Sequence, residues 1–149
     1  MQKSFMIDIK LKYWRMKKMN DDLKTISVPD DKDAIDRLKK LLIGHTLKKI
    51  DDNKLITDNG YILEFEGNDG CGGCCSGNYY IEKLDGCNNL ITNVELKETC
   101  LDNDTEYRYE IFVYTENDKM QILQCDGNDG NGWYGSGYWI YIKGVDSND

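Results

Sequence analysis

The spacing of hydrophobic and polar residues along this chain predicts one helix and a series of short strands. Apolar and polar residues alternate over residues 5–13, which is the period of a half-buried strand. Over residues 34–42 the apolar positions follow helical spacing instead. Asp30 and Asp31 are the expected N-terminal caps of this helix, and Gly44 is its expected stop. We expect the helix to pack on a sheet.

From residue 46 onward the pattern changes to short strands bounded by turn residues. The expected strands are 46–51, 54–57, 61–66, 79–84, 91–99, 107–116, 119–126 and 138–143. Asn59-Gly60 and Asn117-Asp118 fall where hairpin turns are needed. One strand face is predicted to be mainly core, because its positions alternate with those of the other face: Tyr107, Tyr109, Ile111 and Val113 against Arg108, Glu110 and Phe112. The pattern therefore predicts an α+β domain, mainly an antiparallel twisted sheet with one principal helix.

Two glycine-rich loops repeat in one register. The segment Gly67-Asn68-Asp69-Gly70 matches Gly127-Asn128-Asp129-Gly130, and Ser76-Gly77 matches Ser136-Gly137. An aromatic pair follows each loop, Tyr79-Tyr80 in the first and Tyr138-Trp139 in the second. We interpret this as a duplicated strand, glycine loop and strand.

Length and charge favour a basic leader followed by one acidic domain. The chain has 149 residues and a net charge of -8, yet residues 1–20 carry six Lys or Arg against one Asp. We therefore expect a basic N-terminal strand and linker at 1–20 and a single α+β domain at 21–149. An acidic surface repels nucleic acid phosphates and favours basic partners. The sequence shows neither a membrane-spanning apolar run nor a signal region, which predicts a cytoplasmic protein without membrane contact.

Three cysteines in the first loop are the best candidates for metal chemistry. Cys71, Cys74 and Cys75 lie among glycines, and Cys71-x-x-Cys74 has the spacing of a zinc knuckle. A tetrahedral site needs a fourth ligand, and the sequence offers isolated candidates at Cys87, Cys100, Cys125 and His45. The second loop has none of the three cysteines. We therefore expect free thiols and no cofactor, with structural zinc as the alternative.

Acidic and aromatic residues flank both loops and give a second set of candidates. Asp69 and Asp129, with Glu66 and Asp126 three residues before them, could bind calcium, but neither loop has EF-hand spacing, and turns favour the same residues. A nucleotide-hydrolysing enzyme that uses Asp69 or Asp129 with a metal is a separate alternative. The aromatic residues could stack on a base or anchor a protein. The candidate binding residues are Asn68, Asp69, Tyr79, Tyr80, Asp126, Asn128, Asp129, Trp133 and Tyr134.

Two runs carry a family resemblance. Residues 69–76, followed by Tyr80-Ile81-Glu82, and residues 131–138 resemble a family of small uncharacterised domains from bacteriophages and their bacterial hosts. The vicinal pair Cys74-Cys75 and the Asn-Gly-aromatic-Tyr turn carry the likeness, which extends over about 42–143. The family has no established reaction, so the resemblance implies a genomic setting and a fold.

These observations predict a small non-catalytic binding protein, and the resemblance implies that it is phage-encoded and acts in the cytoplasm of a host cell. Its acidic body would dock on a basic surface of a host defence protein and inhibit it. The alternatives are sequestration of a nucleotide signal by the glycine and aromatic loops, and a metal-dependent enzyme or structural zinc protein. We expect no direct contact with nucleic acid, and a homodimer is a reasonable assembly.

Overall fold

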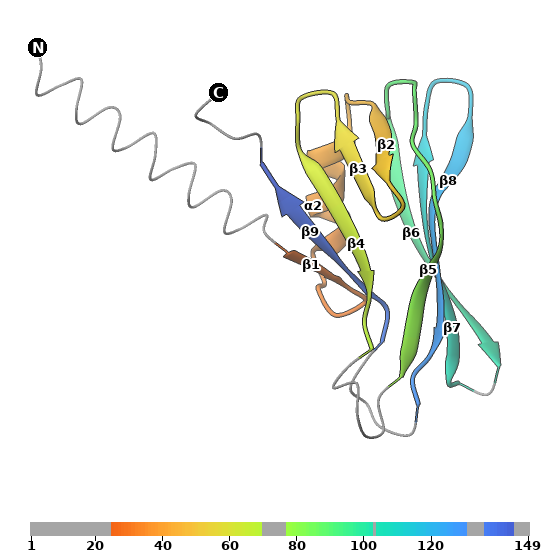
Figure 1. Ribbon diagram of the computed structural model, residues 1–149. Coiled ribbons are helices and arrows are strands. Elements are labelled where there is room, and N and C mark those ends of the chain that lie inside the picture. Colours follow the sequence, from red (N-terminus) through yellow and green to blue (C-terminus); the bar gives the residue numbers. More distant parts are fainter. Residues whose placement is uncertain (1–24, 70–76, 103, 131–135, 145–149) are drawn as a thin grey trace, which may run out of the picture.

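The computed structural model describes residues 25–69, 77–102, 104–130 and 136–144, which form two antiparallel sheets and a helix (Figure 1). The strands of the five-stranded sheet are, in spatial order, β1 (Thr25–Val28), β9 (Tyr138–Lys143), β4 (Ile62–Gly67), β3 (Lys54–Thr57) and β2 (Leu47–Asp51). The strands of the four-stranded sheet are β5 (Asn78–Leu84), β8 (Lys119–Asn128), β7 (Glu106–Tyr114) and β6 (Asn93–Asp102). The helix is α2 (Ala34–Leu42).

The fold class expected from the sequence is confirmed, but the strands divide between two sheets instead of forming one. All strand pairs are antiparallel, and a single short helix accompanies them among the described residues. The sequence also gave no sign of β1, because four residues before a proline are too few to show a period. β1 exists because it pairs with β9, from Thr25 opposite Tyr141 to Val28 opposite Tyr138.

The helix closes one side of the space between the sheets. Its buried residues Ala34, Leu38, Leu41 and Leu42 face the core, as the helical spacing predicted. It contacts β1 and β6, which are edge strands of different sheets. Buried side chains from the helix and from both sheets therefore belong to one hydrophobic core.

The two ends of the helix differ in how well the sequence predicted them. Gly44 has a φ of 86°, a left-handed conformation suited to a glycine stop. The predicted capping by Asp30 and Asp31 is wrong, because the N-cap residue is Asp33 and no side chain caps the helix. The Asp31 carboxylate instead accepts a hydrogen bond from the Ser27 backbone N–H at 2.8 Å and fixes the turn before the helix.

Two connections carry the chain from one sheet to the other. The chain leaves the five-stranded sheet after β4 and enters the four-stranded sheet at β5, and it returns between β8 and β9. In the β4–β9 pair Gly67 lies opposite Tyr138, and in the β5–β8 pair Gly127 lies opposite Tyr79. Both glycines lie where another segment passes close by. A Cβ on Gly67 would be 2.0 Å from the Tyr79 carbonyl oxygen, and one on Gly127 would be 2.3 Å from the carbonyl oxygen of Asn78.

Within the part of the chain that the structure describes, no helix has the length and apolar character needed to cross a membrane. The predicted basic leader, residues 1–20, lies outside the described residues, and its separation from the acidic domain stays a prediction.

Candidate functional site at the loop end

The described ends of the two glycine-rich loops, residues 67–69 and 136–137, are in contact at the lower end of the sheets in Figure 1. We call this region the loop end and define it by residues 29–33, 67–69, 104–106, 128–130 and 136–137. Most of the sequence-predicted binding residues that the structure describes lie here or beside it. Their contacts show which of these side chains are engaged within the protein and which are open to a ligand.

Backbone hydrogen bonds join the segments of the loop end. The Asn68 N–H donates to the Gly137 carbonyl at 3.0 Å, so the two loops are tied directly to each other. The Asn68 side-chain amide also donates to the Ser136 carbonyl at 3.4 Å. The Asp129 N–H donates to the Thr105 carbonyl at 2.7 Å and attaches the β6–β7 turn. The sequence repeat thus places its two Asn-Asp pairs in one connected region.

Tyr79 connects the two aspartates of the repeat. Its backbone N–H donates to the Asp69 carboxylate at 3.0 Å, and its hydroxyl donates to the Asp129 carboxylate. The side chain is buried, and burial together with the bond to Asp129 holds the pKa of the Tyr79 hydroxyl far above its usual value. Tyr79 is therefore a neutral hydrogen-bond donor that positions both loops, and its ring is not presented to solvent.

Two further contacts complete this network. The Tyr109 hydroxyl and the Ser136 hydroxyl are 3.1 Å apart, and the rings of Tyr109 and Tyr79 have centroids 5.9 Å apart. The Asn128 side-chain oxygen accepts a hydrogen bond from the Gly130 N–H at 2.6 Å. Asn128 thus makes the local turn contact for which asparagine is favoured before glycine. Of the described loop residues, Asn68, Asp69, Asn128, Asp129 and Ser136 each have a hydrogen-bond partner within the protein.

Asp126 and Tyr80 lie on the outer face of the four-stranded sheet, opposite each other in the β5–β8 pair. The Asp126 carboxylate receives two bonds from the Arg108 guanidinium, at 2.9 and 3.3 Å, and one from Gln124 at 3.0 Å. Tyr80 is 50% exposed. Among the predicted binding residues that are described, Tyr80 therefore offers the open aromatic surface.

The remaining predicted site residues, Cys71, Cys74, Cys75, Trp133 and Tyr134, lie outside the described residues. Their roles in metal or ligand binding stay predictions. In the described part of the chain, His, Cys, Asp and Glu side chains form no group of three placed to hold a metal ion.

The isolated cysteines and the histidine have separate environments. Cys87 and Cys125 are buried, whereas Cys100 is exposed. Burial raises the pKa of the Cys125 thiol to about 12, with smaller contributions from two nearby carboxylates. This thiol is therefore protonated at neutral pH and is a poor nucleophile. His45 Nδ1 lies 2.7 Å from an Asp58 carboxylate oxygen in an exposed pair.

The electrostatic character of the loop end is strongly negative. The segments that form it carry one described lysine, Lys32, and the acidic residues Asp30, Asp31, Asp33, Asp69, Asp104, Glu106 and Asp129. Asp33, Asp104 and Glu106 are exposed and form no ion pair with any residue that the structure describes. The loop end can therefore attract a positively charged surface.

Sequence reasoning missed three residues of this region: Arg108, Tyr109 and Ser136. Ser136 was visible as a position of the repeat, but nothing predicted its bond to Tyr109. The sequence predicted only that Tyr109 faces the core. The hydrogen bond of its hydroxyl depends on Ser136, which lies 27 residues away in the chain. Because Arg108 alternates with core residues, the sequence predicted that it lies on the outer face of the sheet. The sequence did not identify Asp126 as its ion-pair partner.

Comparison with known proteins gives one family match. The model of a family described as "Domain of unknown function (DUF7448)" matches residues 40–140. This range agrees with the resemblance noted over about 42–143, and the expectation of an uncharacterised family is confirmed. Searches of curated proteins and of solved structures returned no match.

Proposed function

This chain belongs to the DUF7448 family, a domain of unknown function, and on that premise we propose that it is a non-catalytic binding protein. Its loop end would dock on a basic surface of another protein. The observation that carries this proposal is that three exposed carboxylates of the loop end, those of Asp33, Asp104 and Glu106, form no ion pair with any described residue.

The contrast between the loop end and the outer face of the four-stranded sheet supports this choice of surface. On that face Arg108 pairs with Asp126, and Lys119 lies 3.4 Å from Glu95. Each of these two carboxylates has a cation beside it, which weakens its long-range attraction. At the loop end, exposed Asp104 and Glu106 have no cationic partner among the described residues. Uncompensated charge steers association with a surface of opposite sign.

The inhibitory role is a further step of the proposal. Because the family resemblance implies phages and their bacterial hosts, the partner would be a host protein with a basic surface, such as a defence protein that handles nucleic acid. Occupying that surface would block its nucleic acid, in the cytoplasm of the host. Tyr79 holds both repeat aspartates in hydrogen bonds, and carboxylates engaged in this way support binding over catalysis.

We also propose that the two sheet-crossing segments are copies of one duplicated unit. Each contains a strand, an Asn-Asp-Gly loop and a strand that begins at or beside a buried tyrosine. The equivalent pairs, Gly67 with Tyr138 and Gly127 with Tyr79, support a two-fold relation between the copies. Duplication would explain why both acidic loops lie at the same end.

The proposal is tested by neutralising charge at the loop end and, as a matched control, at the other end of the sheets. The test variant is Asp104→Asn with Glu106→Gln. Asp104 has a φ of 62°, a conformation that asparagine tolerates. The control variant is Glu116→Gln with Asp118→Asn in the β7–β8 turn, which removes the same charge at the top of Figure 1.

Each protein would be immobilised and exposed to bacterial lysate at low and high salt, and the captured proteins identified by mass spectrometry. We expect a basic partner whose affinity falls about 2- to 10-fold in the loop-end variant and is unchanged in the control. Raising the salt concentration should weaken binding to the wild-type protein. Equal capture by both variants, or a partner without a basic surface, would refute docking through the loop end.

A further inference from the structure

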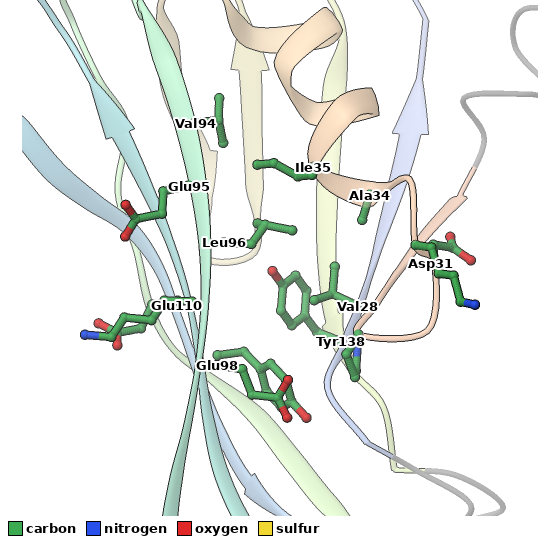
Figure 2. Close-up of a pocket in the computed structure, with 14 residues that line it drawn as sticks. Val28, Asp31, Ala34, Ile35, Val94, Glu95, Leu96, Glu98, Glu110 and Tyr138 are labelled. Atoms are coloured by element: carbon green, nitrogen blue, oxygen red, sulfur yellow. The ribbon is translucent and has the colours of Figure 1, made fainter.

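A cavity lies between the helix and the four-stranded sheet. It has a volume of about 390 Å³, which falls within the range of roughly 300–1,000 Å³ typical of ligand pockets. Its apolar walls are supplied by Val28, Ala34, Ile35, Val94 and Leu96. Figure 2 shows these side chains directed toward the common space from β1, α2 and β6. The cavity thus lies where edge strands of the two sheets face each other beside α2.

Tyr138 at the boundary of this cavity has an unusual property. Its side chain is fully buried, and its hydroxyl has no hydrogen-bond partner among the residues that the structure describes. In Figure 2 the hydroxyl points toward Leu96 and Ile35. The two neighbouring tyrosines differ, since Tyr79 donates to Asp129 and Tyr109 bonds to Ser136.

An unpaired buried hydroxyl is costly, by roughly 1–3 kcal/mol. The packing of the core does not require this hydroxyl, because phenylalanine would supply the same ring at position 138. The ring already packs against Tyr109, with centroids 6.1 Å apart in an edge-on arrangement. A polar atom without a partner beside an apolar cavity therefore suggests that the partner belongs to a bound molecule.

Charged groups around the cavity limit the chemistry of such a molecule. Glu98 lines it, is exposed and forms no ion pair or hydrogen bond with any described residue. Asp31 and Lys32 also border it. The carboxylates of Glu95 and Glu110 point away from Tyr138 (Figure 2) and accept hydrogen bonds from Tyr114 and Gln121 instead. The excess of carboxylates disfavours an anion. A cation placed at the Tyr138 hydroxyl would lose its hydration, because its surroundings are apolar.

We propose that this cavity binds a small uncharged molecule with an apolar body and one hydroxyl or similar hydrogen-bonding group, which pairs with the Tyr138 hydroxyl. The hydroxyl is directed toward Ile35 and Leu96 (Figure 2), which are only partly buried. Rotation of these two side chains would open the way to it without disturbing the sheets. The cavity shares Pro29, Asp31 and Lys32 with the loop end, but the inference does not rest on docking there.

The test uses three probes of similar size: p-cresol, toluene and benzoate. Toluene lacks the hydroxyl of p-cresol, and benzoate carries a negative charge. Binding to the full chain would be followed by titration with two-dimensional amide NMR. We expect p-cresol to give saturable shifts at Ala34, Ile35, Val94 and Leu96, with an affinity about 2- to 10-fold higher than that of toluene. Benzoate should give no saturable shifts.

Two variants and a control separate the hydroxyl from the cavity itself. Tyr138→Phe should reduce p-cresol affinity to that of toluene and leave toluene binding unchanged. Leu96→Trp, which fills the cavity, should abolish binding of both, while Tyr80→Phe on the exposed outer face should change neither. The inference is overturned if p-cresol produces no saturable shifts, or if its advantage over toluene persists in Tyr138→Phe.

Discussion

Replacing Tyr138 by phenylalanine should stabilise this protein, whereas the same replacement at Tyr109 should destabilise it. Both side chains are almost fully buried, and their rings are in contact. Each substitution removes one hydroxyl and preserves the ring. The two sites differ in that the Tyr109 hydroxyl is bonded to Ser136 at 3.1 Å, while the Tyr138 hydroxyl has no partner among the described residues.

The expected magnitudes follow from this difference. A buried polar group without a partner costs roughly 1–3 kcal/mol, so we expect Tyr138→Phe to raise the free energy of unfolding by about 1 kcal/mol. A typical buried hydrogen bond contributes about 1 kcal/mol, and Tyr109→Phe should lower the free energy of unfolding by about that amount. The two variants should therefore differ by about 2 kcal/mol.

Urea unfolding followed by circular dichroism measures this difference directly. With a slope of about 2 kcal/mol per molar urea, the midpoints of the two variants should lie about 1 M apart, on opposite sides of the wild type. The slopes should be unchanged, because neither variant alters the surface exposed on unfolding. If Tyr138→Phe destabilised the protein as much as Tyr109→Phe does, the Tyr138 hydroxyl would have a partner within the protein, and the reasoning would be refuted.

Two other predictions concern a glycine and a cysteine. Gly137→Ala should destabilise by about 3 kcal/mol or more, because φ is 75° and the new Cβ would lie 1.7 Å from a β1 carbonyl oxygen. In thermal unfolding its melting temperature should fall well below that of Gly44→Ala, where φ is 86° but no atom lies within 4 Å; equal shifts would contradict the steric argument. Since burial raises the pKa of the Cys125 thiol to about 12, this thiol should stay protonated at pH 8.5 and resist iodoacetamide in the folded protein, whereas exposed Cys100 should react. Peptide mass mapping measures the labelling of each cysteine. Rapid labelling of Cys125 would show that its thiol is accessible to solvent and would contradict the prediction. Because the folded-state pKa of this thiol lies above the unfolded value of about 8.5, its contribution to stability should be lost as pH rises beyond 8.5.

Local patterns predicted much of the secondary structure. The helix over residues 34–42 and most strand positions followed from apolar spacing, because burial on one face leaves a period of 3.6 or 2 in the sequence. Hairpin turns at Asn59-Gly60 and Asn117-Asp118 were predicted from the residues that tight turns require. The short strand β1 and the uncapped start of the helix were not predicted, since each depends on neighbours distant in sequence or on a competing local bond.

The candidate site was predicted less completely. The repeat identified both Asn-Asp loops, but the sequence could not show that Tyr79 bonds to Asp69 and Asp129, or that Arg108 holds Asp126. The cavity beside Tyr138 left no pattern in the sequence at all. Its walls come from β1, α2 and β6, which are separated along the chain and adjacent only after folding.

The sequence by itself determined the class of fold, the positions of the turns, the acidic character of the body and the family. Each of these depends on residue type and on spacing between near neighbours. The tertiary structure decided that the strands form two sheets, that the described ends of the two loops are in contact, and that the hydroxyl of Tyr138 is buried without a partner among the described residues. The period of apolar residues shows which side chains face a core. It does not show which strand or helix they will contact there, and those contacts between distant segments form the site.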